Sequence, residues 1–469
     1  MSKVLLILLI FSCAKANGQL VSLTDFIESA RTNSYASQST NTGLQIANLS
    51  HKIFTLSGKP VVFFNGNAPV YNKDNYAVIQ PDGTILFLPR SQNYSYAGFS
   101  FSQPLLFSGG SVAVSTDLYR IDNFTANNKQ YNGVPVFVRL SQPIFKYNAF
   151  KWEKQIAPLR LQEAKQTYKA NQEQIAYEVC RLYFVVVAAQ ENEKLAISNL
   201  EHADANLAIE KRRVVLGSST EDKVMGLEIQ QISIQQMLEA AKLDIRKGFA
   251  ELNTYINASD TTLKKLQVPE NIPQLSLDKK TIIEKAKENL PLYISSRRKI
   301  KEAEAKIDQA KKTGKQIDIQ ASYGLNNSAT DLASIYRNPR SQQGFSIGFN
   351  LTIADWGRRK NNIALTELEK KLTETDIKLE ESRLLLEIGN IVDELQALKS
   401  NIVLSVKLDT LSQKRFAVAN RLFQSGRLTL LELQAAQFEK DSARKNYILA
   451  LQRFWEQWYL LKARTLTEL

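Results

Sequence analysis

The chain has 469 residues, a formal net charge of +13 and hydrophobic residues at 44% of its positions. A basic balance suggests nucleic acid as one class of partner, but Lys and Arg alternate with Glu along helical stretches such as residues 367–371, which is typical of solvated helix faces. Its only histidines, His51 and His202, lack metal-ligand spacing, and the sequence has no nucleophile–base constellation or glycine-rich phosphate loop. We therefore expect no nucleic-acid partner, no enzyme activity, no metal and no cofactor.

Residues 1–18 have the pattern of an export signal. A charged start is followed by the apolar run 4–11 and by small residues up to Gly18, an order typical of a cleavable signal peptide. An alternative uses residues 10–13 as a lipoprotein box, in which Cys13 would be acylated. No later stretch approaches the roughly 20 apolar residues of a membrane helix. We expect the mature chain to be periplasmic, secreted or part of an outer-membrane β-barrel.

The remainder of the chain repeats itself at a fixed offset of 209 residues. Arg212, Gly217, Thr220 and Val224 reappear as Arg421, Gly426, Thr429 and Leu433. Each copy has the pattern of a strand, a very long helix, a sharp turn and a second helix, and such a tandem repeat indicates the architecture before any site is considered. We divide the chain into a first repeat at residues 19–258, a linker at 259–278 that would form a belt, and a second repeat at 279–469.

The first repeat opens with a helical pattern over residues 24–57. This helix matches the start of the second repeat at an offset of 256, whereas later elements match at 209, so the first repeat contains 47 extra residues. The insert lies within residues 67–132, and it is either an additional hairpin or an enlarged external loop. A long helix from 149 to about 215, interrupted at Pro158, and a returning helix from 220 to about 256 follow.

The second repeat begins with a helical pattern over 281–315 that is broken at Pro291. Residues 317–323 and 345–353, on either side of a polar loop, alternate between apolar and polar side chains. Alternation over about nine residues is typical of transmembrane β-barrel strands, although a half-buried hairpin on a soluble core has the same period. A helix from 358 to about 424, on the order of 100 Å long at 1.5 Å per residue, precedes the turn at Gly426 and a last helix.

These elements predict a mainly α chain with transmembrane β-strands. Open sheet edges are not tolerated in lipid, so strands from several chains must close one shared β-barrel. The duplicated coiled-coil hairpins of the same oligomer would form a periplasmic α-barrel. A barrel through the outer membrane that continues into a helical tunnel is a duct for export.

This duplicated plan resembles the TolC-like outer-membrane efflux protein family. The likeness rests on the Ser-Gln-Pro-Ile-Phe segment at 141–145 and on the second turn at 421–433, whereas the first turn at 212–224 is a looser match. The resemblance implies a passive homotrimeric channel with a shared twelve-stranded barrel, used for efflux of small molecules. It also implies a periplasmic adaptor (membrane fusion) protein at the helix tips and an inner-membrane pump that supplies energy. The insert departs from the simplest family pattern.

The two turns are the candidate functional sites, because both would lie at the far end of the tunnel. Gly217 and Gly426 supply positive φ where a helix ends, and Thr220 and Thr429 can cap the helices that follow. We assign these four residues to an adaptor-docking tip. Charged residues at the same end are candidates for an entrance gate: Arg212, Arg213, Asp222, Arg421, Arg427 and Glu432.

Two other functions remain open on the sequence. One is a channel for type I protein secretion, which would share the whole architecture. The other is a pore-less coiled-coil structural protein of the periplasm, which would share the helices but does not account for the alternating strands.

Overall fold

The fold is known from a computed structural model that describes residues 21–259, 262–273 and 278–467. The predicted signal peptide and Cys13 lie outside the described residues. The helices are α1 (Leu23–Asn33), α2 (Tyr35–Ser57), α3 (Ala149–Val215), α4 (Glu221–Ile256), α5 (Lys279–Asn289), α6 (Pro291–Lys312), α7 (Leu332–Arg337), α8 (Arg358–Gln424) and α9 (Leu430–Thr465). The strands are β1 (Val61–Ile79), β2 (Ile85–Leu105), β3 (Gly110–Asn123), β4 (Asn128–Ile144), β5 (Lys315–Ala329) and β6 (Arg340–Leu351).

The chain divides into two compact units, which we describe separately. The helical unit comprises residues up to Leu44, residues 164–293 and residues from 381 onward. The sheet unit comprises residues 45–163 and 294–380. None of the described helices is both long enough and apolar enough to cross a membrane.

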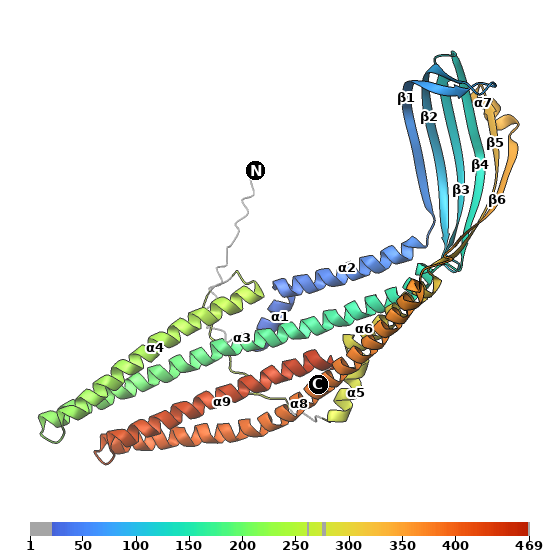
Figure 1. Ribbon diagram of the computed structural model, residues 1–469. Helices are drawn as coiled ribbons and strands as arrows, with labels where there is room; N and C mark the ends of the chain where they lie inside the picture. The colour runs from blue at the N-terminus through green and yellow to red at the C-terminus, as the bar shows by residue number, and fades with distance from the viewer. Residues whose placement is uncertain (1–20, 260–261, 274–277, 468–469) are drawn as a thin grey trace, which may run out of the picture. The chain divides into compact units, whose positions relative to one another are not determined.

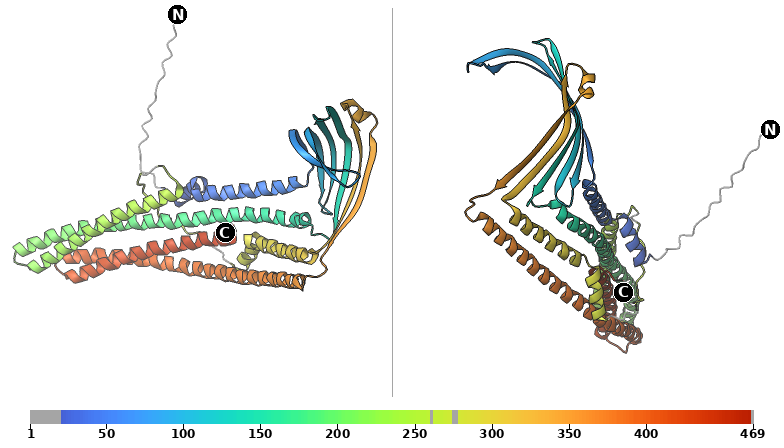
Figure 2. Two further views of the ribbon diagram at one scale, coloured as in Figure 1. Left: turned by 45° about the horizontal axis from the view of Figure 1, so that its top comes forward. Right: turned by 90° about the vertical axis from the view of Figure 1, so that its right-hand side faces the viewer.

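The long helices confirm the constant offset of the repeat. Helices α3 and α8 have 67 residues each, and α4 and α9 have 36 each. Within the helical unit α4 turns back beside α3 and α9 turns back beside α8 (Figure 2). Pro158 does not interrupt α3, contrary to the prediction. It lies inside α3, which continues to Val215, so the helix accommodates the loss of one backbone N–H without ending there.

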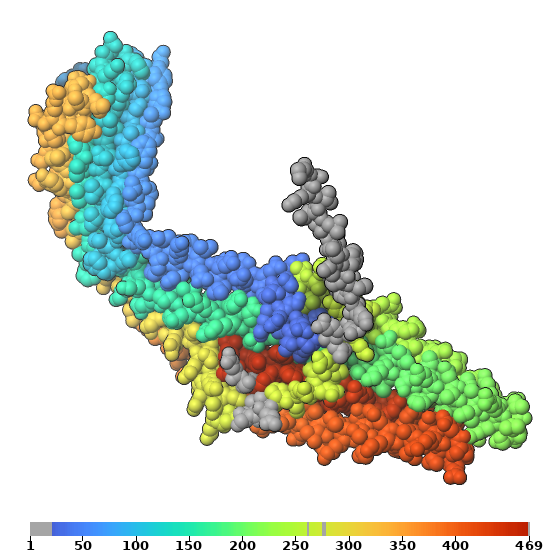
Figure 3. Space-filling model, turned by 180° about the vertical axis from the view of Figure 1, so that it is seen from behind, coloured from blue at the N-terminus to red at the C-terminus, as the bar shows by residue number. Residues whose placement is uncertain are grey.

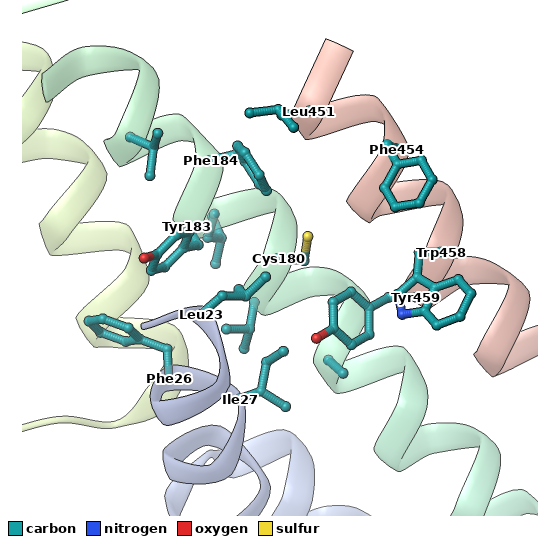
Figure 4. Close-up of a cluster of buried hydrophobic side chains, with 14 of the residues drawn as sticks. Leu23, Phe26, Ile27, Cys180, Tyr183, Phe184, Leu451, Phe454, Trp458 and Tyr459 are labelled. Atoms are coloured by element: carbon teal, nitrogen blue, oxygen red, sulfur yellow. The ribbon is translucent and has the colours of Figure 1, made fainter. Parts of the chain in front are cut away.

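A continuous apolar core holds the helical unit together. Phe184 and Tyr183 of α3 pack between α1 and α9, where Phe454 and Trp458 lie close by (Figure 4). The described part of the linker follows this core, because Leu266 is buried in it and pairs with Val21 in a parallel bridge. Phe454, Trp458 and Tyr459, near the C-terminus, are thus core residues.

The sequence pattern predicts one of the two breaks between short helices. The predicted break at Pro291 is confirmed, since α5 ends at Asn289 and α6 begins with the proline. The helix predicted at 24–57 is instead two helices, because Ser34 adopts an extended backbone. The hydroxyl of Ser34 accepts a hydrogen bond from the backbone N–H of Ser37, which caps α2. A serine that starts a new helix in this way resembles any helical serine in the sequence.

The strands form one antiparallel sheet in the order β1-β2-β3-β4-β5-β6 (Figure 1). The first repeat therefore contributes four strands and the second two, so the insert adds strands rather than an external loop. The strands have 12 to 21 residues, longer than the alternating segments, because backbone pairing continues through polar residues beyond the apolar stretch. Helix α7 forms within the segment predicted as a polar loop, and its Ile335 is buried against Gly133 of β4.

The register places apolar side chains on one face of the sheet. Val62, Phe101, Val114, Val138 and Tyr323 lie side by side across five strands. The opposite face is mainly polar, with Ser141, Gln320 and Ser346 aligned across β4, β5 and β6. The strand side chains form one continuous surface (Figure 3). The period-two pattern is thus realised as an apolar face and a polar face.

Phe454→Ala tests the importance of the helical core. Phe454 is fully buried, and loss of such a side chain costs about 3–5 kcal/mol through lost transfer energy and a residual cavity. The measurement is the free energy of unfolding from urea titration followed by far-ultraviolet circular dichroism. Phe438→Ala on the same helix is the matched control, because Phe438 is 73% exposed. Equal losses in the two variants would contradict the assigned core.

Candidate functional site

The two turns of the helical unit close with the same backbone hydrogen bonds. Gly217 and Gly426 have φ of 70° and 76°, in the left-handed region that glycine adopts without strain. The N–H of Ser218 donates to the carbonyl of Arg213 at 2.8 Å, and the N–H of Arg427 donates to that of Leu422 at 2.9 Å. Both are Schellman endings, so the predicted role of the two glycines in the turn backbone is confirmed.

The two threonines behave differently. Thr429 and Glu432 form a capping box: the Glu432 N–H donates to the Thr429 hydroxyl at 3.3 Å, and the Glu432 carboxylate accepts from the Thr429 N–H at 2.9 Å. Thr220 has an extended backbone at the N-cap of α4 but makes no side-chain cap hydrogen bond. The expectation that Thr220 caps α4 through its side chain is wrong. The residue three positions later is Lys223, which cannot complete a capping box.

Arg213 joins the two hairpins of one chain. Its Nη2 donates to the carbonyls of Gln424 at 2.6 Å and Phe423 at 3.2 Å, and its Nη1 donates to the buried Glu210 carboxylate at 2.9 Å. The hydroxyl of Ser219 donates to the same carboxylate. The last carbonyls of α8 lack helical partners and carry partial negative charge, so a guanidinium is favourable there. Arg213 thus ties the end of α3 to the end of α8.

The other gate candidates lie on the surface. Arg212, Asp222, Arg421 and Arg427 are exposed, and in the part of the chain that the structure describes none forms an ion pair with a side chain of opposite charge. Arg421 donates to the carbonyl of Ala417 on its own helix. Glu432 is engaged in the cap of α9. Four of the six charged candidates are therefore available to another molecule, and two already have partners within the chain.

A buried polar seam between the two hairpins was not found from the sequence. Asn206 of α3 donates to the Asn420 side chain of α8 at 3.0 Å. Farther from the turn on α3, Asn199 accepts a hydrogen bond from the buried Lys440 ammonium of α9 at 2.6 Å. The sequence does carry a signal, because these polar residues occupy positions of an otherwise apolar helical stripe. Buried polar groups require partners, so the seam fixes which residues of the two hairpins face each other.

Apolar side chains are exposed next to the turns. Val215 and Leu216 at the end of α3 are 87% and 79% exposed, and Leu431 in the first turn of α9 is also exposed. Below them a small core of Leu227, Phe423 and other residues is buried between the hairpins. The turns therefore combine a rigid base with an apolar outer surface.

Among the described residues, no group of three or more His, Cys, Asp or Glu side chains could hold a metal ion.

Comparison with known proteins gives a family match over most of the chain. A profile described as "Outer membrane efflux protein" matches residues 95–258 and 282–463. No curated protein is similar enough in sequence to match.

Solved structures match over nearly the whole chain at low identity. The outer membrane protein VceC from Vibrio cholerae has 13% identity and a TM-score of 0.67, covering 94% of this chain and 95% of that one. The Campylobacter jejuni CmeC outer membrane channel has 14% identity and a TM-score of 0.67, covering 94% and 85%. The open state of the Neisseria gonorrhoeae MtrE outer membrane channel has 15% identity and a TM-score of 0.63, covering 94% and 88%. The fold is therefore that of these channels.

The unequal threonines generate a paired prediction. Thr429→Ala removes a side-chain cap, which typically weakens a helix start by a factor of about five, so amide hydrogen exchange in the first turn of α9 should accelerate by about that factor. Thr220→Ala should leave exchange in the first turn of α4 unchanged, because no cap bond is lost. Thr429→Ser is the control that keeps the hydroxyl. Equal acceleration in both alanine variants would contradict the assigned cap.

The same capping box has a predicted pH dependence. The Thr429 hydroxyl and N–H hold the pKa of Glu432 below its ordinary value of 4.5. A carboxyl group whose pKa is lowered by folding stabilises the fold above its ordinary pKa and loses that contribution as pH falls through the lowered value. Protection of the first α9 amides should therefore persist at pH 5 and above and decline on acidification below pH 4.5. In Glu432→Gln this decline should be absent.

Proposed function

The chain belongs to the outer membrane efflux protein family, and from this premise we propose that it is one protomer of a passive outer-membrane export duct for small molecules. The observation that carries the proposal is the six-stranded sheet with one apolar face, one mainly polar face and two unpaired edges. A lipid-facing apolar surface and a water-facing polar surface are the two sides of a transmembrane barrel wall.

The sheet edges support an oligomer. Within the described residues β1 pairs only with β2, and β6 pairs only with β5. Each edge therefore presents a row of backbone N–H and C=O groups that lipid cannot satisfy. Pairing of β6 with β1 of a neighbouring copy would satisfy both edges. The proposed assembly is a homotrimer, as the resemblance implies.

The strand number changes one expectation. The family resemblance implies a twelve-stranded barrel, whereas three chains of six strands each would supply eighteen. Barrel diameter grows roughly in proportion to strand number, and barrels of 16–18 strands leave an aqueous channel. The proposed trimer therefore has a wider membrane pore than the resemblance alone implies.

The turns are the proposed contact with the rest of an export machine. Val215, Leu216 and Leu431 offer apolar surface on a rigid base at Gly217 and Gly426. Such a surface suits a periplasmic adaptor protein, which would connect the duct to an energised inner-membrane pump. Thr220 and Thr429 belong to the same tip.

The gate candidates have three proposed roles. Arg213 would keep the tip closed within one chain by holding the end of α8 to α3. Arg212, Asp222, Arg421 and Arg427, which are exposed, would pair with neighbouring copies or with the adaptor. Glu432 contributes through the α9 cap. Opening would then be a shift in population driven by a partner that binds the open tips more tightly.

The remaining alternatives differ in cargo and in the presence of a pore. A type I protein secretion channel would have the same architecture, and the wide barrel is compatible with it. A pore-less periplasmic coiled coil is disfavoured, because it would leave the apolar sheet face and both sheet edges in water. No enzymatic role is proposed.

Electron microscopy of the purified oligomer tests the duct directly. We expect a three-fold particle whose barrel contains eighteen strands, and single channels in planar bilayers. A monomer without conductance would sink the proposed function. A two-fold particle would leave the duct but overturn the trimer.

Arginine variants test the proposed gate. Arg213→Ala should raise single-channel conductance by releasing α8 from α3, and Arg421→Ala combined with Arg427→Ala should raise it by removing contacts between chains. Arg246→Ala, an exposed arginine on α4 away from the turns, is the matched control and should leave conductance unchanged. If the tip variants and the control conduct alike, the gate lies elsewhere.

A further inference from the structure

The sheet unit contains a basic cavity where the strands meet the helices. Its lining residues are Gly314, Lys315, Leu351, Thr352, Asp355, Arg359, Lys360 and Ile363. They come from the start of β5, the end of β6 and the start of α8. The cavity volume is about 590 Å³, which lies in the usual range of sites for small ligands. We refer to it as the basic cavity.

The charges of the basic cavity are not balanced. Lys315, Arg359 and Lys360 are cationic, and Asp355 is the one acidic residue of the lining. The Asp355 carboxylate already accepts the N–H groups of Gly357 at 3.0 Å and Arg359 at 2.9 Å. In the described part of the chain Lys315 and Lys360 have no acidic side chain within ion-pair distance. The excess positive charge favours an anionic ligand.

Arg359 has unused capacity to donate hydrogen bonds. Its Nη2 donates to the carbonyl of Lys311, while its Nε is buried and has no partner among the described residues. A buried donor without a hydrogen-bond acceptor costs free energy, and a bound ligand that accepts the hydrogen bond would remove that cost. A guanidinium also matches the geometry of two phosphate oxygens. The chemistry of the cavity therefore suits a phosphate group.

The surroundings favour a phosphate that carries acyl chains. Leu351 lines the cavity and continues the apolar row of Ile347 and Phe349 along β6. Just beyond the strand, Ile353 and Trp356 are 99% and 97% exposed. A free phosphate ion makes no favourable contact with these apolar side chains. A phospholipid places its headgroup in a basic site and its acyl chains on an apolar surface.

Exposed aromatic residues lie just beyond the ends of three strands. Phe107 follows β2, Phe145 follows β4 and Trp356 follows β6. Because the antiparallel register brings the final residues of β2, β4 and β6 to the same end of the sheet, these three exposed aromatic residues all follow strands at that end. Rows of aromatic residues lie at the headgroup level of transmembrane barrels. In the proposed duct, the basic cavity, which lies at the same end of the sheet, would therefore be at the depth of lipid phosphates.

We propose that the basic cavity binds the headgroup of an anionic phospholipid, with the acyl chains lying along the apolar face of β6. The inference rests on the proposed function, because it requires the sheet to lie in the outer membrane. The lipid would belong to the leaflet on the side of the helices. Bound there, its phosphate would reduce the excess positive charge of Lys315, Arg359 and Lys360 where the strands enter the helices.

Tryptophan quenching by brominated lipid tests the proposal. The full-length oligomer, delipidated in a neutral detergent, is titrated with phosphatidylglycerol or with phosphatidylcholine, both carrying brominated acyl chains. The signal of Trp356 is isolated by subtracting the same titration of Trp356→Phe. We expect quenching by phosphatidylglycerol at concentrations at least tenfold lower than by phosphatidylcholine, and we expect added salt to weaken only the former. Equal quenching by the two lipids would overturn the proposal.

Charge variants separate the basic cavity from general attraction to the basic chain. Lys315→Gln with Lys360→Gln should weaken phosphatidylglycerol binding by roughly tenfold to thirtyfold, because each cation near an anionic lipid surface contributes a factor of about five. Lys73→Gln with Lys129→Gln removes the same charge from exposed positions elsewhere on the sheet and should change binding by less than about twofold. Equal effects of the two pairs would contradict a localised site.

Two further measurements separate lipid binding from phosphate binding and from failed assembly. Inorganic phosphate at millimolar concentration should not displace phosphatidylglycerol, and full displacement would mean that the cavity takes free phosphate rather than lipid. Each preparation is also inserted into planar bilayers. Conducting channels without lipid selectivity would overturn this inference alone, whereas a preparation that neither assembles nor conducts would overturn the proposed function.

Discussion

The unpaired backbone at the edges of the sheet is the constraint on which the proposed assembly depends. Water can satisfy such groups at the surface of a soluble protein, but hydrocarbon cannot. In the proposed duct, the two edges of the sheet would therefore find their missing hydrogen bonds in other copies. Oligomerisation would then be a condition for membrane insertion rather than an addition to a finished fold.

The helical unit meets a different requirement with a different interaction. Its centre is an apolar core of fully buried residues such as Tyr183 and Phe454, whereas near the turns a smaller apolar cluster is joined by a buried polar seam and by Arg213. The hydrogen bonds of Arg213 depend on distance and angle and weaken steeply when that geometry is lost. In the proposed gate, their loss would release the end of α8 from α3 while the apolar core stays packed.

Much of the fold could be predicted because the sequence contains two strong patterns, a long-range repeat and a period-two alternation. The 209-residue offset located both long helices, and period-two alternation located β5 and β6. The missed features depend on single hydrogen bonds or on distant partners. The break at Ser34, the short helix α7 and the partners of Arg213 and Asn206 arise from contacts that no local pattern encodes. Thr220 and Thr429 illustrate the limit, since the same residue at equivalent positions caps one helix and not the other.

The insert, finally, has a consequence for how such chains can diversify. A hairpin added inside an antiparallel sheet leaves the direction of both neighbouring strands unchanged, because it adds strands in pairs. The chain therefore leaves the sheet at the same end of the strands, and α3 and α8 keep identical lengths. In the proposed trimer, the diameter of the pore could in this way change in steps of two strands per subunit without any change in the length of the helices that lead to the turns.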